Sequence, residues 1–162
     1  MAEAFNEREL PHGKDARYRE VAAEIASVLD GEPNLTARMA TVASMLASSF
    51  DHYFWTGFYV VDGEELVVGP YQGTLGCLRI ALGRGVCGTA AASGKTQLVE
   101  DVDAFPGHIA CDARSKSEVA VPVFDKAGRL IAVFDVDSDR PAAFDETDAR
   151  WLETILGDTF AR

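Results

Sequence analysis

Long apolar runs are missing from this chain of 162 residues. Its longest apolar stretches are far shorter than the roughly 20 residues that a membrane-spanning helix needs, so no membrane partner is expected. Basic residues are also scarce: 15 Lys and Arg stand against 26 Asp and Glu, which gives a formal net charge of −11. Such a charge repels phosphate groups, and nucleic acid is therefore not expected as a partner either.

Cysteine is equally scarce, with only Cys77, Cys87 and Cys111. The N-terminal stretch MAEAFNERELPHGK is acidic and polar and lacks the apolar region of a signal peptide, so we expect a cytoplasmic location. In that reducing compartment the three cysteines are expected to be thiols rather than a disulfide framework. No short CxxC spacing is present, and His108-x-x-Cys111 is only half of a zinc site. We therefore expect no metal.

The apolar fraction of 48% and the charged fraction of 25% are typical of a folded globular protein. We expect one domain over residues 1–162, with residues 1–13 as a loose N-terminal arm. Helical periodicity and capping residues predict helices over Tyr18–Leu29, Leu35–Phe50 after the N-cap Asn34, Val86–Ser93 before Gly94, and a last helix after the cap Asp145 that turns Trp151, Leu152, Ile155 and Leu156 inward.

Runs rich in aromatic and β-branched residues predict the strands. They lie at Tyr53–Val61, Glu65–Tyr71, Cys77–Leu82, Thr96–Val99, Val119–Phe124 and Arg129–Val136. Turn residues predict that the first two strands and the last two strands form hairpins. This order of elements predicts an α+β domain with a mainly antiparallel central sheet flanked by helices.

A long polar loop, Glu100–Lys116, carries the stretch AFPGHIACDARS. A cysteine in such a loop is unusual, because an inert cysteine prefers an apolar core, so Cys111 is predicted to be a reactive thiol. His108 is placed to lower the pKa of Cys111, although a lone loop histidine is more often simply solvated. Arg114 and Lys116 follow, with two open readings: a lower pKa for the thiol, or binding of a substrate carboxylate. Cys87 has about even odds of being a buried small residue.

Acidic residues mark the ends of two apolar strands. Asp135 and Asp137 are two apart and share one face of a strand, and the predicted hairpin brings Glu118 close to them. Three carboxylates near one another raise at least one pKa, and they suit both an ammonium group and proton donation. The alternative is that the strand simply emerges into water there. Trp55 and Tyr59 also share a face, either as core residues or as a wall for a small apolar group such as a thioether methyl.

Several of these stretches together resemble the free methionine-(R)-sulfoxide reductases, which are built on a GAF domain. The matching stretches are FWTGFYVV, GPYQG, CLRIALGRGVCGTA, GKTQLVEDVDAFPGHIACDA, SEVAVPV and DVDS. All three cysteines fall inside these stretches. The resemblance covers about Phe54 to Ser138 and, loosely, the flanking helices. GAF domains at large are usually ligand-binding regulatory modules, so the fold alone does not imply catalysis.

The resemblance implies an L-methionine (R)-S-oxide reductase that works without a cofactor. Cys111 would attack the sulfoxide, Glu118 or an aspartate would protonate its oxygen, and Cys111 would be left as a sulfenic acid. Cys77 is the implied resolving thiol, with Cys87 as a backup resolver or, on a rival assignment, the nucleophile. Thioredoxin would reduce the resulting disulfide.

The substrate site implied by the resemblance uses Asp135 and Asp137 for the ammonium group or the sulfoxide and Trp55 for the methyl end. A homodimer is expected from the GAF resemblance. Two rival hypotheses stay open: a GAF sensor that binds a small ligand without turnover, and a redox-sensing disulfide protein without a small substrate. The sensor is less expected because no output domain is attached.

Overall fold

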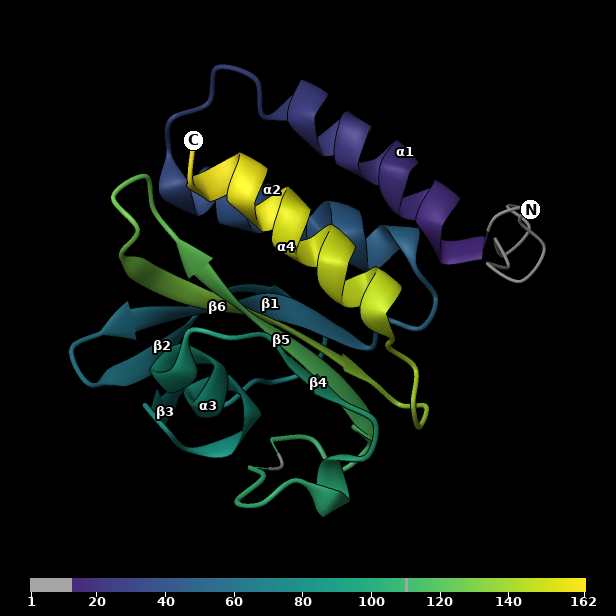
Figure 1. Ribbon diagram of the computed structural model, residues 1–162, viewed down its shortest axis with the longest axis vertical. Coiled ribbons are helices and arrows are strands. Elements are labelled where there is room, and N and C mark those ends of the chain that lie inside the picture. The colour runs from purple at the N-terminus through teal and green to yellow at the C-terminus, as the bar shows by residue number, and fades with distance from the viewer. Residues whose placement is uncertain (1–12, 110) are drawn as a thin grey trace.

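The computed structural model describes residues 13–109 and 111–162. One six-stranded antiparallel sheet, in the order β3-β2-β1-β6-β5-β4, forms the centre of the molecule (Figure 1). The elements are α1 (Gly13–Val28), α2 (Leu35–Ser49), β1 (Trp55–Asp62), β2 (Glu65–Gln72), β3 (Arg79–Ala81), α3 (Gly85–Ser93), β4 (Gln97–Val99), the 3-10 turn η2 (Val102–Ala104), β5 (Ser117–Phe124), β6 (Leu130–Ser138) and α4 (Glu146–Phe160). The predicted α+β class with an antiparallel sheet is confirmed.

The helix ends follow the capping residues of the sequence. The Asn34 side chain accepts a hydrogen bond from the backbone N–H of Ala37, which is otherwise unpaired at the start of α2. Asp145 caps α4 in a reciprocal capping box with Asp148. Gly94 ends α3 in the left-handed conformation, with φ of 68°, that only glycine adopts without strain. These three predicted boundaries are therefore confirmed.

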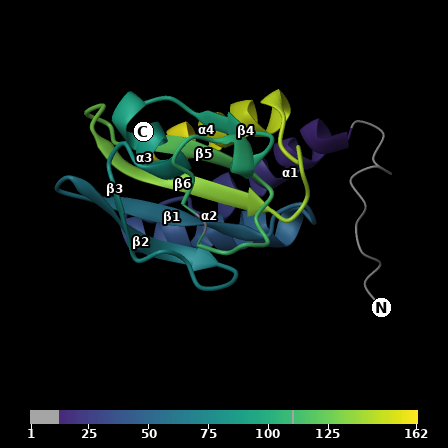
Figure 2. The ribbon, with the colours of Figure 1, turned by 90° about the horizontal axis from the view of Figure 1, so that it is seen from below.

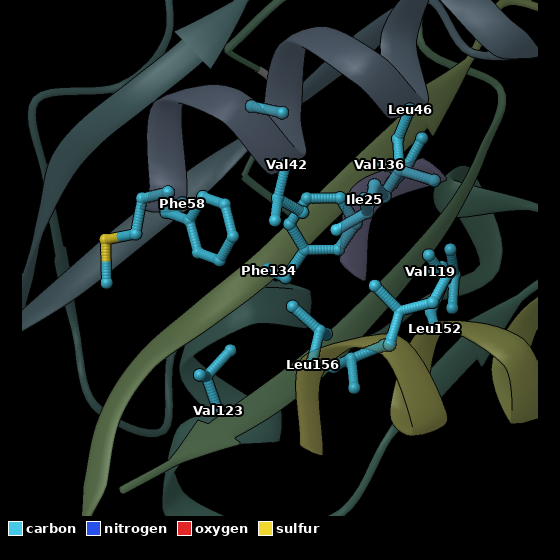
Figure 3. Close-up of a cluster of buried hydrophobic side chains, with 14 of the residues drawn as sticks. Ile25, Val42, Leu46, Phe58, Val119, Val123, Phe134, Val136, Leu152 and Leu156 are labelled. Carbon is cyan, nitrogen blue, oxygen red and sulfur yellow. The ribbon is translucent and has the colours of Figure 1, made fainter. Parts of the chain in front are cut away.

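Helices α1, α2 and α4 cover one face of the sheet, and α3 with the long loop covers the other (Figures 1 and 2). The larger core lies under the three helices, where the Phe58 and Phe134 rings of neighbouring strands pack with their centroids 4.9 Å apart, in one cluster with Leu46 and Leu156 (Figure 3). A smaller core on the opposite face packs α3 against the sheet. Because this second face is only partly filled by apolar side chains, it has room for the candidate site.

Two sequence-based expectations about the elements are wrong. The third strand begins at Arg79, since the chain before it is held by a disulfide at Cys77. The first helix begins at Gly13 rather than Tyr18, and the rest of the expected arm, residues 1–12, lies outside the described part of the chain. Trp151 of α4 is half-buried and packs against the larger core as expected, and its indole Nε1 donates to Asp15 at 2.8 Å. Within the described residues, no helix is long and apolar enough to cross a membrane.

Candidate active site

A cleft opens on the α3 face of the sheet, between the β2–β3 connection and the long loop before β5. Its empty volume is about 530 Å³, open mouth included. Every residue that the sequence singled out as catalytic or substrate-binding lies in or at this cleft: Trp55, Tyr59, Cys87, Cys111, Glu118, Asp135 and Asp137 line it, and Cys77 is bonded to one of them. The structure therefore brings the predicted residues together.

Strand register aligns the floor of the cleft. Across three neighbouring strands, Trp55 of β1 pairs with Asp137 of β6, and Asp137 pairs with Glu118 of β5. One step along the same strands, Gly57 pairs with Asp135. A side chain at Gly57 would clash with Tyr71, so the glycine lets the Trp55 and Tyr71 rings stack with their centroids 5.1 Å apart.

Two of the three acids on the floor are buried, and Asp137 is half-buried. Glu118 is 5% exposed and Asp135 is 3% exposed. Burial, and then the neighbouring Asp137, raises the pKa of Glu118 to about 8. Burial followed by Glu118 raises the pKa of Asp135, and burial followed by Asp135 raises that of Asp137. The interpretation that the strand emerges into water is wrong at Asp135.

One oxygen of this cluster lacks a partner. Asp135 Oδ1 is buried and accepts no hydrogen bond from the described residues. Leaving a buried polar atom unpaired costs about 1–3 kcal/mol, so native proteins keep few of them. The atom therefore marks where a ligand with a donor group would bind.

The thiols differ sharply in their surroundings. Cys77 and Cys111 form a disulfide with their Cα atoms 5.4 Å apart, the pairing that the resemblance implied. Cys87 is free and buried, and its Sγ donates to Glu118 Oε2 at 3.7 Å. Burial, and then Asp135, raises the pKa of Cys87 well above its usual value. A thiol held neutral in this way is a poor nucleophile.

His108 lies over the acids rather than in solvent. Its Nε2 is 3.6 Å from Glu118 Oε1, and its side chain is 13% exposed. Burial lowers the pKa of His108, with a smaller opposing effect from Asp103. The expectation of a solvated loop histidine is wrong, because the loop folds back over the strand that carries Glu118.

The aromatic wall combines both predicted roles. Trp55 and Tyr59 are buried and stack at 5.5 Å, and both face the cleft. Trp55 Nε1 donates to the carbonyl of Thr74 at 2.9 Å, and Thr74 Oγ1 donates to Asp112 at 2.8 Å. This chain of hydrogen bonds ties the wall to the loop that carries Cys111.

Arg114 is not free to act on a thiol or a ligand. Its guanidinium donates to both oxygens of Asp112, at 3.1 and 2.8 Å, and lies 4.9 Å from the centroid of the Phe54 ring. The Arg114 hydrogen bonds hold the pKa of Asp112 well below its usual range. Eight further lining residues were not predicted as part of a site, because nothing in their own neighbourhood points inward: Leu75, Gly76, Ile80, Arg84, Gly85, Val86, Ile109 and Ser115.

A metal site was not expected, and one set of donors merits description. Ligand atoms of Cys87, Glu118 and Asp135 lie within 4.8 Å of one another, which would allow all three to reach one small cation. Metal binding requires these groups to be deprotonated, whereas burial raises all three pKa values. The arrangement thus fits proton donation better than metal binding.

Known proteins share this fold and this arrangement of the chain. The profile of the GAF domain matches residues 34–159. "GAF domain-containing protein A" of Dictyostelium discoideum is 49% identical over 88% of this chain and 90% of its own. The "Free methionine-R-sulfoxide reductase" of Escherichia coli is 38% identical over 86% and 84%. The crystal structure of the free methionine-R-sulfoxide reductase of Neisseria meningitidis in complex with its substrate superposes with a TM-score of 0.85, at 47% identity over 95% and 88% of the two chains.

Proposed function

Because this chain belongs to the free methionine-(R)-sulfoxide reductases of the GAF domain family, we propose that it reduces free L-methionine (R)-sulfoxide to L-methionine with its own thiols as the electron source. One observation carries the proposal: the Cys77–Cys111 disulfide lies at a cleft whose floor holds three carboxyl groups with raised pKa values. The disulfide corresponds to the end of one turnover, and the protonated acids correspond to the proton donors that it needs.

In the first step the Cys111 thiolate attacks the sulfoxide sulfur while Glu118 protonates the sulfoxide oxygen. The oxygen passes to Cys111, which becomes a sulfenic acid, and the sulfoxide sulfur gains the two electrons that Cys111 loses. Methionine then leaves. The Cys77 thiol attacks the sulfenic acid, the disulfide forms and one water is released. Cys87 takes no covalent part, because its buried thiol stays protonated.

The substrate is held from both ends of the cleft. The unpartnered Oδ1 of Asp135 and the neighbouring Asp137 receive the ammonium group or the protonated sulfoxide. Trp55, stacked on Tyr59, packs against the methyl end. Thioredoxin regenerates the thiols by exchange, no cofactor is used, and the protein acts in the cytoplasm as a homodimer.

A single-turnover assay tests this proposal. The reduced protein is mixed with the R or the S isomer of free methionine sulfoxide without added reductant, and methionine formed and thiols lost are counted. We expect about one methionine per chain, from the R isomer only, with about two thiols lost. Cys111→Ser should form none, while the matched control Cys87→Ser should still form about one.

Either of two results would contradict the proposal. Activity in Cys111→Ser would remove the assigned nucleophile. No methionine from either isomer, together with binding that ignores thiol blocking, would favour a ligand-binding GAF sensor. Rapid oxidation by peroxide without selectivity between the isomers would favour a redox-sensing protein instead.

A further inference from the structure

Exposed apolar side chains flank the two disulfide-bonded cysteines: Leu75 and Ile109 line the cleft with Cys111, and Leu78 follows Cys77 in the chain. Among the described residues, Leu75, Leu78 and Ile109 are 77%, 71% and 36% exposed, and the only other large apolar side chains this exposed are Val28 and Leu35. Single exposed leucines are ordinary, but a group of them usually marks an interaction surface. We call Leu75, Leu78 and Ile109, together with the Cys77–Cys111 disulfide, the disulfide patch.

A thiolate in solvent can reach the disulfide of the patch. Leu78 follows Cys77 directly, and Ile109 lies two residues before Cys111 in the chain. Cys111 is exposed, whereas Cys77 is half-buried. An incoming thiolate therefore reaches the Cys111 sulfur more easily than the Cys77 sulfur.

The two segments that carry the patch are richer in cations than the whole chain. Residues 73–84 and 104–116, the two segments that the disulfide joins, contain four cations and one acid, Asp112, for a net charge of +3, in a chain of net charge −11. Arg79 pairs with Asp62 and Glu65, which lie outside these segments, and Arg114 pairs with Asp112. No described acid pairs with Arg84 or Lys116, so these two residues carry the unpaired positive charge. A partner with acidic groups around an apolar centre complements this surface.

We propose that the disulfide patch is the docking surface for a protein dithiol whose attacking thiol lies in an apolar surface with an acidic rim. This inference rests on the proposed function, because that function requires the disulfide to be reduced after each turnover. A second copy of this chain suits the patch less well, since a symmetric contact would place the two cationic rims against each other.

Reduction of the disulfide by the partner takes two thiol–disulfide exchange steps. The partner's thiolate attacks Cys111 Sγ, the Cys77–Cys111 bond breaks, and Cys77 leaves as a thiolate that takes up a proton. The partner's second thiol then attacks its own sulfur of the mixed disulfide and releases Cys111. The protein gains two electrons, and the partner dithiol becomes a disulfide.

The test measures reduction of the oxidised protein itself, without sulfoxide, so it does not depend on turnover. Thioredoxin with its reductase and NADPH is compared with dithiothreitol, a small dithiol that needs no docking surface. The variant is Leu78→Ser, which lies outside the cleft lining, and the matched control is Val28→Ser, which removes an apolar side chain 60% exposed on α1.

We expect Leu78→Ser to lower kcat/KM for thioredoxin about tenfold and to leave the dithiothreitol rate unchanged. Val28→Ser should change neither rate. Added salt should slow reduction by thioredoxin and not by dithiothreitol. A thioredoxin variant without its second cysteine should be trapped on Cys111.

Equal thioredoxin rates in the wild type and Leu78→Ser, or an equal loss with dithiothreitol, would overturn the docking surface. Dissociation of an oligomer by Leu78→Ser would assign the patch to a second copy of the chain and overturn it too. A mixed disulfide on Cys77 would overturn the assigned route of attack. Failure of the proposed function would be visible separately, as a protein that thioredoxin reduces but that forms no methionine.

Discussion

Buried acids lie on both sides of the sheet, and the two groups differ in how many hydrogen-bond donors they contact. Under the helices, Asp148 is fully buried and receives hydrogen bonds from Lys14 Nζ at 2.6 Å, Tyr18 OH at 2.6 Å, His52 Nε2 at 3.0 Å and the Asp145 backbone N–H at 2.9 Å. In the cleft, Asp135 is also buried, but one of its oxygens has no partner among the described residues.

The pKa values follow this difference. Burial alone raises the pKa of Asp148, but hydrogen bonds from His52, Lys14 and Tyr18 outweigh it, and the pKa lies well below its usual range. In the cleft, burial raises the pKa of Glu118 to about 8, and no described cation reverses it. A buried carboxylate that is saturated with donors stabilises the fold, whereas one that lacks them is available for a ligand or a proton.

The largest expected change in stability comes from Asp148, whose carboxylate receives four hydrogen bonds. Asp148→Asn removes the charge that faces Lys14 and leaves donors without an acceptor, so the free energy of unfolding should fall by about 3–5 kcal/mol. Denaturant unfolding measures this. The matched control is Asp158→Asn, an exposed acid of α4 in a surface pair with Arg162, which should cost about 0.5 kcal/mol or less. Equal losses in the two variants would remove the distinction between the two acid groups.

The second-largest expected effect is the pH dependence of stability that Glu118 causes. Its folded pKa of about 8 exceeds the ordinary 4.5, so the folded state keeps a proton that the unfolded state releases. The stability it contributes is complete below pH 4.5 and is lost as pH rises to about 8, a fall of the order of a few kcal/mol. Glu118→Gln should make the free energy of unfolding nearly independent of pH between pH 4.5 and about 8.

Asp148 has the opposite sign, because its lowered pKa gives stability that is lost as pH falls below its ordinary 3.8. Asp148→Asn should therefore leave unchanged the fall in the free energy of unfolding between about pH 4.5 and 8. Both predictions are checked by measuring the free energy of unfolding of the oxidised wild type, Glu118→Gln and Asp148→Asn across this pH range. Parallel curves for the wild type and Glu118→Gln would refute the raised pKa.

A change in function rather than stability is expected at Asp135. Asp135→Asn keeps the volume but removes an unsatisfied acid, so the free energy of unfolding should change by less than about 1 kcal/mol. Methionine formed in a single turnover should slow about 100-fold, because the group that contacts the substrate is changed. Asp139→Asn, an exposed acid just after β6, is the control and should change neither quantity. A large loss of stability without loss of rate in Asp135→Asn would reverse the comparison.

The cleft was accessible to sequence reasoning where strand periodicity decides the geometry. Alternation placed Asp135 and Asp137 on one face, and the hairpin turn predicted the pairing that brings Glu118 opposite Asp137. The contact between His108 and Glu118 was missed, because a loop without periodicity gives no information on where it folds back. The prediction of a strand from Cys77 was also wrong, because a disulfide rather than strand pairing fixes that segment, and the sequence pattern does not show the disulfide.

The Asp148 group was also missed, although a signal existed. Asp145 and Asp148 are three apart at a helix start, the spacing of a capping box, and this spacing predicts that Asp148 turns back toward the N-terminal end of the helix. It does not reveal Tyr18 or His52, which come from more than 90 residues away in the chain. Long-range side-chain contacts of this kind depend on how the helices pack, which local patterns leave open.

The smallest expected effect separates the hydroxyl of Tyr18 from its ring. Tyr18 OH donates to Asp148 at 2.6 Å and lies 2.6 Å from Tyr53 OH, while its ring packs 4.2 Å from Phe50. Tyr18→Phe keeps the ring and leaves Asp148 with its other three donors, so the loss should be about 1–2 kcal/mol, below that of Asp148→Asn. Tyr71→Phe, whose hydroxyl has no hydrogen bond among the described residues, should cost about 0.5 kcal/mol or less. If Tyr18→Phe cost as much as Asp148→Asn, the hydroxyl and not the saturated carboxylate would hold this group together.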